Sequence, residues 1–242
     1  MNEQAKTPAI VNWPGYLAIA LLALLPISVL MVRAGTWQQG LLLYALACLG
    51  SIALLILFVV LLMLPSLAQW RAGIRRRALA ALPGTLALLS LTLGGTDYPA
   101  IHDITTDTED PPLFVTAAGQ RGEGANTLDI KPDELDVQRA AYPDLQSIRA
   151  PGSIDQAYTR ALAVARELGW EVYHEDREAG IIEAVDTTRI MLFKDDVVIR
   201  VRGDADGGYV DLRSVSRVGQ GDIGANAKRI RAFRDAFLSA GS

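Results

Sequence analysis

The chain has 242 residues, half of them hydrophobic, and a net charge of −4. Residues 1–94 hold six basic residues and one acid, so this part carries +5 and the remainder carries −9. An acidic surface cannot replace the counterions of a polyanion, which excludes nucleic acid as an expected partner. The single cysteine, Cys48, lies in an apolar run, which excludes an intrachain disulfide and a Cys-ligated zinc site.

Three apolar runs predict a multi-pass α-helical membrane anchor over residues 1–94, with transmembrane helices at about 16–32, 41–64 and 78–93. The second run, at about 1.5 Å per residue, exceeds a hydrocarbon core of ~30 Å. The third run is shorter and contains Pro83, which membrane helices tolerate when neighbours satisfy the freed backbone groups. We therefore expect three spans, with the lipid bilayer as the partner of this part.

The basic residues set the expected orientation. Arg71 and Arg75–Arg77 lie in the short loop between the second and third runs, and short basic loops stay in the cytoplasm. We expect a cytoplasmic amino terminus in a bacterial inner (plasma) membrane, with everything after residue 93 in the periplasm or outside the cell. The three runs contain no Asp, Glu, Lys, Arg or His, which argues against a transport role.

Residues 95–152 form a connecting segment rich in proline and glycine. Its prolines and the glycine-rich stretch at 119–126 interrupt any long element. We expect this segment to have little regular structure of its own and to pack along the domain that follows.

Residues 153–242 predict an α+β domain outside the cytoplasm. Ser153 precedes apolar residues at helical spacing, which Gly169 ends. A second helix, capped by Asp222 or Asn226, runs to about Ser239. Between the helices lie four strand-like runs, at 170–175, 180–187, 196–202 and 209–216. Consecutive strands with short loops pair antiparallel, so the expected fold is a four-stranded antiparallel sheet with two helices on one face.

The last two strands also predict their own register. The stretch 203–208 has the composition of a hairpin loop. Pairing Val201 with Val210 across it places Arg200 opposite Asp211, and opposite charges on facing strand positions favour this register.

Several segments of the outer part resemble a known family. They are Asp195–Arg200 (DDVVIR), Arg213–Gly219 (RSVSRVG) and Asp222–Ile230 (DIGANAKRI), preceded by Ile101–Asp107 and Pro111–Pro112. Over about residues 98–238 the chain resembles the bacterial family catalogued as domain of unknown function 1499. Members similar to this chain often carry membrane spans before the domain. The resemblance implies no activity, cofactor or catalytic residue.

The candidate polar or interaction site is the dense polar stretch from the last strand to the last helix, with two acids of the preceding strand: Asp195, Asp196, Arg213, Ser214, Ser216, Arg217, Asp222, Asn226 and Arg229. In a structural role, Asp222 caps the helix and the arginines bond neighbouring acids. In a functional role, arginines and Asn226 point outward, because a guanidinium forms directional, bidentate bonds with a partner. We expect Asp222 to be structural and Arg217 to be partly functional.

His102, Asp103 and Asp107 are weak candidates for metal ligands. Their spacing matches neither a calcium loop nor a helical histidine pair, and Asp side chains in turns often bond their own backbone. We therefore expect no cofactor.

The favoured function is a non-enzymatic accessory or protein-interaction module anchored in the membrane, with another membrane or envelope protein as its partner. One alternative is a metal-assisted hydrolase that uses His102, Asp103 and Asp107. A second alternative is a binder of a small amphipathic or lipid ligand. A ligand binder requires an apolar cavity, whereas a module requires a filled core and an exposed patch.

Overall fold

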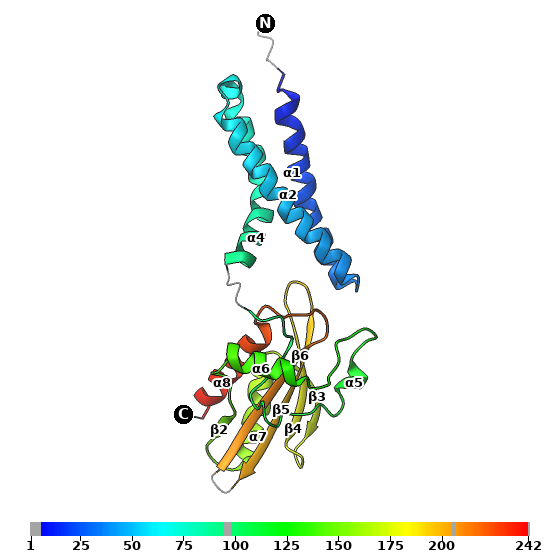
Figure 1. The fold of residues 1–242 in the computed structure, drawn as a ribbon, viewed down its shortest axis with the longest axis vertical. Helices are drawn as coiled ribbons and strands as arrows, with labels where there is room; N and C mark the ends of the chain where they lie inside the picture. The colour runs from blue at the N-terminus through cyan, green and yellow to red at the C-terminus, as the bar shows by residue number, and fades with distance from the viewer. Residues whose placement is uncertain (1–5, 94–97, 205–206, 242) are drawn as a thin grey trace. The chain divides into compact units, whose positions relative to one another are not determined.

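A computed structural model describes residues 6–93, 98–204 and 207–241. The chain separates into two compact units, Met1–Thr96 and Asp97–Ser242 (Figure 1).

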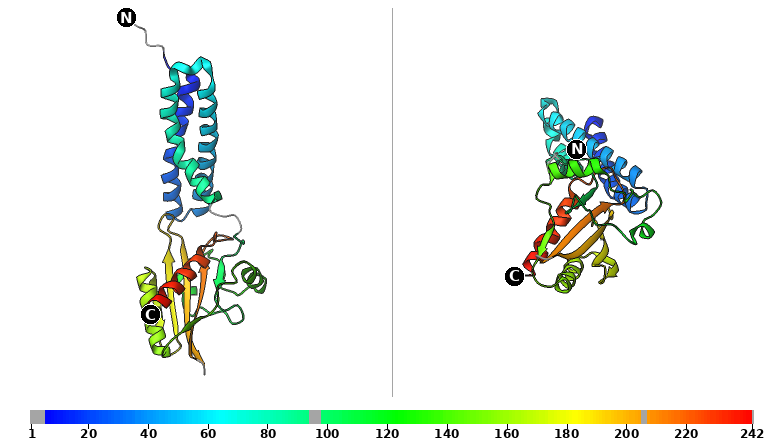
Figure 2. Two further views of the ribbon diagram at one scale, coloured as in Figure 1. Left: turned by 90° about the vertical axis from the view of Figure 1, so that its left-hand side faces the viewer. Right: turned by 60° about the horizontal axis from the view of Figure 1, so that its bottom comes forward.

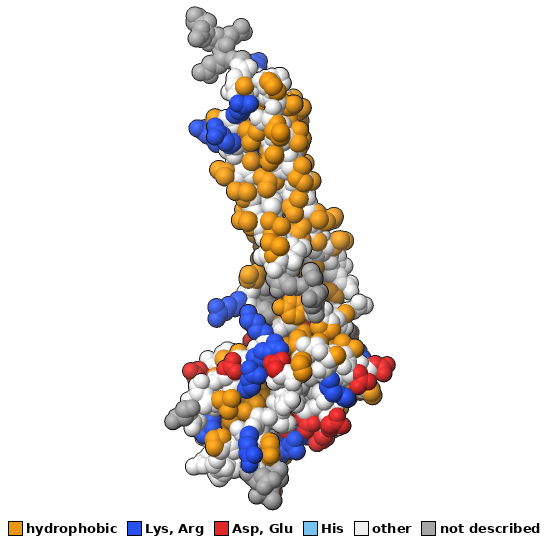
Figure 3. Space-filling model, turned by 60° about the vertical axis from the view of Figure 1, so that its left-hand side comes forward, with side chains coloured by type: hydrophobic (Ala, Val, Ile, Leu, Met, Phe, Trp, Pro, Cys, Tyr) orange, Lys and Arg blue, Asp and Glu red, His pale blue; other side chains and the backbone are white. Residues whose placement is uncertain are grey.

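The first unit is helical. Helices α1 (Ala9–Arg33) and α2 (Trp37–Met63) are long and apolar enough to cross a membrane. Many of their large hydrophobic side chains are exposed, Leu30 and Leu42 among them. Figure 3 shows hydrophobic side chains over the visible face of this unit and a group of Lys and Arg side chains at one end. The two helices are compatible with a membrane anchor.

The expectation of three transmembrane helices is wrong for the third, at about 78–93. Among the described residues, only α1 and α2 have the length and composition of a span. The chain after them forms η1 (Pro65–Trp70), α3 (Arg71–Ala78), η2 (Leu79–Ala81) and α4 (Leu82–Leu93). Pro83 has no N–H to donate, and its ring crowds the carbonyl of Leu79, so a 3-10 turn interrupts the α-helix before it. At about 1.5 Å per residue, α4 is roughly 18 Å long.

Small residues let the helices of this unit approach one another. A Cβ atom on Gly84 of α4 would lie 2.4 Å from Oγ of Ser51 in α2, and one on Gly15 of α1 would lie 2.5 Å from Cδ of Arg77. Arg77 crosses between helices, with its Nη2 donating to Asn12 Oδ1 at 2.6 Å. Such contacts are how membrane helices pack without a hydrophobic driving force.

The second unit is an α+β domain built on a six-stranded antiparallel sheet (Figures 1 and 2). The strand order is β1-β6-β5-β4-β3, and β2 also pairs with β6. The strands are β1 (Asp103–Thr105), β2 (Ile148–Ala150), β3 (Glu171–Asp176), β4 (Ile181–Thr187), β5 (Lys194–Asp204) and β6 (Gly207–Ser216).

The expected number of four strands is therefore wrong. The two additional strands, β1 and β2, come from the connecting segment 95–152. They lie one after the other along β6, opposite 213–215 and 208–210. Three residues are too few to show the alternation of polar and apolar side chains by which a strand is recognised. The same segment also forms α5 (Ala117–Gln120) and α6 (Pro132–Ala141).

The predicted hairpin register is confirmed. Val201 faces Val210, and Arg200 faces Asp211. Residues 205 and 206 of the predicted hairpin loop lie outside the described residues.

Two helices cover one face of the sheet. Helix α7 (Ile154–Glu167) begins with a capping box between Ser153 and Gln156, and α8 (Ala225–Ser239) is the last element. Alternate strand residues, such as Val197, Ile199 and Leu212, point at these helices. They form the core together with Trp170, which precedes β3, and Phe233 of α8. The rings of Trp170 and Phe233 stack with centroids 5.6 Å apart.

The opposite face of the sheet is covered by residues 106–131, the segment that follows β1. Phe114 lies against Arg213, Thr116 bonds Glu183, and Arg121 pairs with Asp196. The hydrophobic core thus lies under the helices, and most of the buried charged residues of the strands lie under this irregular cover.

Candidate functional site: two arginine–carboxylate networks

Strand geometry divides the predicted site residues between two faces. Side chains alternate along a strand, so Asp195, Ser214 and Ser216 face the helices, while Asp196 and Arg213 face the irregular cover. The structure therefore places the candidate residues in two separate networks.

Arg229 of α8 is the centre of the network under the helices. Its Nη2 donates to Asp195 Oδ2 at 2.5 Å, and its Nε donates to Asp186 Oδ2 at 2.7 Å. Its Nη1 donates to Ser214 Oγ at 3.0 Å and also bonds the side-chain oxygen of Asn226. Only 5% of the Arg229 side chain is exposed, so the reading in which Arg229 points outward to a partner is wrong.

Asn226 links the last helix to the sheet. It is fully buried, and its Nδ2 donates to the carbonyl of His102 and to Ser216 Oγ, each at 2.9 Å. Its Oδ1 accepts from Ser214 Oγ at 2.7 Å. The outward-pointing reading is therefore wrong for Asn226 too, and both serines act as hydrogen-bonding positions in this network.

Asp222 bonds the start of the last helix, although the N-cap position is Gly224 and not the predicted Asp222 or Asn226. Its Oδ1 accepts from the backbone N–H of Gly224 at 2.8 Å, and its Oδ2 accepts from that of Asn226 at 2.7 Å. Burial raises the pKa of the Asp222 carboxyl, and the two backbone hydrogen bonds offset part of that rise.

Asp196 is the centre of a second network, under the irregular cover. It is fully buried. Arg217 donates to both of its oxygens, at 3.0 and 2.7 Å, and Nη1 of Arg121 lies 3.0 Å from Oδ2. Burial opposes the charge of Arg217, but its bonds to Asp196 outweigh burial and raise its pKa. Burial lowers the pKa of Arg121, and the pairing with Asp196 acts against that.

Glu183 of β4 anchors the cover to the sheet. It is fully buried and accepts from the backbone N–H of Val115, and from the N–H of Thr116 at 2.9 Å and its hydroxyl. Tyr173 of β3 is close by, where burial, Glu183 and Asp196 together raise the pKa of its phenol well above the usual value.

Arg213 joins the start of the domain to its last strand. Its side chain is 1% exposed, and its Nη2 donates to Asp103 Oδ2 at 2.6 Å and to the carbonyl of Leu128 at 2.7 Å. The guanidinium also lies 5.5 Å from the ring centre of Phe114, a cation–π contact.

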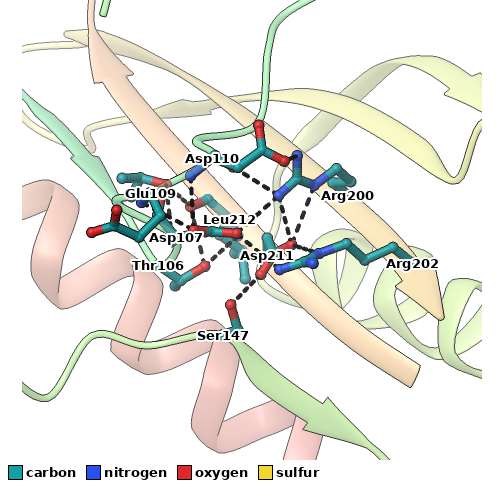
Figure 4. A network of polar contacts seen from close by, with 10 residues as sticks. Thr106, Asp107, Glu109, Asp110, Ser147, Arg200, Arg202, Asp211 and Leu212 are labelled. Carbon is teal, nitrogen blue, oxygen red and sulfur yellow. Dashed lines mark hydrogen bonds and ion pairs between the residues drawn. The ribbon is translucent and has the colours of Figure 1, made fainter. Parts of the chain in front are cut away.

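A third cluster of charges clamps the turn at 107–110 onto the sheet (Figure 4). Asp211 is fully buried, and its Oδ2 accepts from Arg200 Nη2 at 2.9 Å and from Arg202 Nε at 2.6 Å. Asp107 accepts from the same two arginines, at 3.2 and 2.8 Å, and Arg200 also reaches Asp110 at 2.8 Å. The cluster pairs two arginines with three carboxylates.

The three candidate metal ligands do not converge. His102 is buried with Nδ1 3.4 Å from the carbonyl oxygen of Gln220, Asp103 pairs with Arg213, and Asp107 pairs with Arg200 and Arg202. Within the described residues, no group of three or more His, Cys, Asp or Glu side chains is arranged to hold a metal ion.

A small hollow lies between Asp103, Arg213 and the start of α6. Its volume is about 10 Å³, which is room for about one water molecule.

The networks include residues that the sequence analysis did not select as site candidates. Arg200, Arg202 and Asp211 had a signal, because the predicted register already placed Arg200 opposite Asp211. Glu183 sits among apolar strand residues, where a lone charge predicts a buried partner. Arg121 had no such signal, because it lies in an irregular segment far along the chain from Asp196.

The fold and the networks define a class of protein: a helical unit with two apolar helices of membrane-span length, followed by an α+β domain with charged residues paired internally on both faces of its sheet. Residues 103–237 match the model of the family described as "Protein of unknown function (DUF1499)", and the chain belongs to that family. The resemblance noted from its motifs is thereby confirmed. No curated protein matches the chain.

Proposed function

We propose that this protein is a membrane-anchored accessory module that holds its α+β domain outside the cytoplasm of a bacterial cell, where the domain binds another membrane or envelope protein. The observation that carries the proposal is the pair of long apolar helices whose large hydrophobic side chains are exposed. Exposed Leu and Ile over the full length of two neighbouring helices are stable in lipid and costly in water.

We propose that the helical run after α2 returns the chain across the membrane, although no single helix in it has the length of a span. Helices α3 and α4 form an almost continuous helical run from Arg71 to Leu93, broken only at η2. The apolar part, 78–93, is about 24 Å long at 1.5 Å per residue, and a bilayer thins locally to match a short span. Arg75–Arg77 precede it, and short basic segments stay on the cytoplasmic side. In this proposal the α+β domain is therefore on the other side.

Alkaline-phosphatase fusions test this topology. A fusion after residue 95 should be active, because the enzyme folds only after export, and a fusion at residue 73 should be inactive. A matched green-fluorescent-protein series at the same two positions should give the opposite pattern. Inactive phosphatase at 95 together with fluorescence there would place the domain in the cytoplasm and overturn the proposal.

The hydrogen bonds of the candidate polar residues favour a module over an enzyme. The candidate residues bond one another or the backbone, as Arg229, Asn226, Asp196 and Arg213 all do. The hollow beside Asp103 has room for about one water. Neither the hydrolase nor the ligand-binder alternative has a specific observation in its favour, so the outer surface of the domain is the place for a partner.

Affinity purification from detergent-solubilised native membranes tests the module function. The full chain should retain a protein that is lost when residues 98–242 are deleted. The same protein should still be retained when Arg231, a half-buried residue that pairs with Asp144, is replaced by alanine. Recovery of the same proteins with and without the domain would show that the domain recruits none of them.

A further inference from the structure

The turn between β4 and β5, residues 188–193, has two hydrophobic side chains that are exposed at the surface. Ile190 is 65% exposed and Leu192 is 46% exposed. Exposed basic residues, Arg189 and Lys194, stand on either side of them. The turn therefore combines apolar tips with flanking cations.

This turn is held in place by its own hydrogen bonds. The N–H of Leu192 donates to the carbonyl of Thr188 at 3.1 Å, and the N–H of Thr188 donates to the carbonyl of Phe193 at 2.8 Å. The Thr188 hydroxyl accepts from the N–H of Phe193 at 2.9 Å. Leu192 is kept at a φ of 57°, a left-handed conformation unusual for leucine. Unusual backbone held by its surroundings is concentrated at functional surfaces.

A second apolar tip lies at the same end of the sheet. Ile223, in the loop between β6 and α8, is 64% exposed at a φ of 53°, which is more unusual still for a β-branched residue. Asp195 faces Ser216 across the sheet, and the N–H of Arg217 donates to the carbonyl of Lys194 at 3.1 Å. The two loops therefore leave the sheet side by side (Figure 2).

The chain also enters the domain at this end. The ring of Tyr98 lies against Gly224, next to Ile223, and the side chain is 43% exposed. Residues 94–97 alone separate Tyr98 from Leu93, the last residue of α4. Five Cα-to-Cα steps span at most about 18 Å even when fully extended. If α4 ends at the membrane surface, the end of the domain that carries these tips is tethered within that distance of the bilayer.

We propose that the tip surface, formed by Ile190, Leu192, Ile223 and Tyr98, docks on the bilayer that the chain's own helices cross. This proposal rests on the proposed membrane anchoring. Isoleucine and leucine side chains enter the acyl boundary, a tyrosine ring suits the headgroup level, and cations such as Arg189 and Lys194 attract anionic phospholipids.

Depth-dependent fluorescence quenching in vesicles tests the docking. The probe is an environment-sensitive nitrobenzoxadiazole dye on Ile190→Cys in the full chain carrying Cys48→Ala, reconstituted in vesicles of phosphatidylethanolamine and phosphatidylglycerol. We expect emission at shorter wavelength and quenching by lipids that carry a doxyl group near the headgroup. The matched control carries the dye on Ala179→Cys, in the exposed turn between β3 and β4 at the opposite end of the sheet, and should show neither effect.

Equal emission and equal quenching at positions 190 and 179 would overturn the docking. A wavelength shift at 190 that grows with the protein-to-lipid ratio and resists doxyl quenching would identify a second copy as the occupant instead, and would also overturn it. Failure of the anchor itself is a separate result, because the chain would then fail to float with the vesicles after an alkaline carbonate wash. Unchanged thermal unfolding of the labelled chains verifies that each variant is folded.

The charge part of the proposal has its own variant. Lys194→Gln should lower the fraction of quenched dye at position 190 in vesicles with phosphatidylglycerol, with the docking constant falling on the order of fivefold for one lost cation. The same substitution should have no effect in vesicles of phosphatidylcholine alone. An equal effect in both vesicle types would show that Lys194 does not meet anionic lipid.

Discussion

Two arginines of α8 lie two positions apart and contribute to stability very differently. Arg229 is almost fully buried between Asp195 and Asp186, whereas Arg231 pairs with Asp144 at the surface, where 36% of the arginine side chain is exposed. Removing one partner of a buried pair leaves a charge without compensation, but removing one partner of an exposed pair returns the other to water.

We therefore expect Arg229→Ala to lower the free energy of unfolding by about 3–5 kcal/mol. Arg231→Ala, the matched control on the same helix, should lower it by less than about 1 kcal/mol. Urea unfolding of the detergent-solubilised chain, followed by circular dichroism, measures both. Equal losses would mean that burial does not distinguish the two pairs.

The Asp144–Arg231 pair also predicts a dependence on pH. Hydrogen bonds from Arg231 hold the pKa of Asp144 at about 2, below its ordinary value. A lowered pKa in the folded state adds stability above the unfolded value, and that stability is lost as the pH falls through the folded value. The gap in melting temperature between the unaltered chain and Asp144→Asn should thus be constant above about pH 5 and should close towards pH 2. A gap that widens in acid would contradict this assignment.

At the scale of elements, the turn between β3 and β4 depends on a glycine. Gly180 has a φ of 72°, and a Cβ atom there would lie 2.1 Å from the carbonyl oxygen of Val201. The carbonyl of Gly180 accepts from the N–H of Val201 at 2.7 Å. The start of β4 therefore cannot move away from β5 to make room without losing this bond.

Gly180→Ala should therefore destabilise the domain by more than about 1 kcal/mol, from backbone strain and from the clash together. Gly119→Ala is the matched control, because nothing lies within 4 Å of a Cβ at that position and its backbone is not left-handed. The measurement is the midpoint of urea unfolding. A neutral Gly180→Ala would mean that the turn moves freely.

The elements with a clear period were predictable from the sequence. Helices α7 and α8 and strands β3 to β6 occupy the expected ranges to within a few residues, because apolar spacing of 3.6 or 2 residues records which side chains meet the core. The short strands β1 and β2 carry no such record. Their pairing with β6 depends on contacts more than 50 residues away, and no local pattern reports those contacts.

The residues of the candidate site could be predicted from the sequence, but the burial of their side chains could not. The density of charge between Arg213 and Arg229 singled out residues that do form networks. Asp196 and Arg217 are shielded from water by the cover, residues 106–131. That segment is irregular, so no sequence pattern predicts where it lies. Density of charge by itself does not separate a covered face from an exposed one.

At the scale of the whole molecule, the folded domain is larger than residues 153–242, the part with a clear sequence period, because it includes the irregular cover. Without residues 98–152, Glu183 would lose its donors from Val115 and Thr116, and Asp196 would lose Arg121. Loss of the cover would also expose Val198 and Val215, which are buried on the same face of the sheet. The lost apolar burial, added to the lost pairs, is a large fraction of the stability of a domain of this size.

A fragment of residues 98–242 should accordingly unfold in one cooperative thermal transition, and a fragment of residues 153–242 should show none. Circular dichroism and differential scanning calorimetry on the two purified fragments check this directly. A cooperative transition in the shorter fragment would show that the cover adds nothing essential to the fold.

The two short strands on β6 have a consequence for pairing between neighbouring copies of the chain. An uncovered strand edge offers unpaired N–H and C=O groups to any similar chain that comes near. Anchored proteins diffuse in two dimensions and meet copies of themselves often. Laid end to end, β1 and β2 close the β6 edge, and β3 at the other edge carries exposed Glu171 and Glu175 and a register shift after Val172. Both borders of the sheet thus discourage strand exchange between neighbouring copies of the chain.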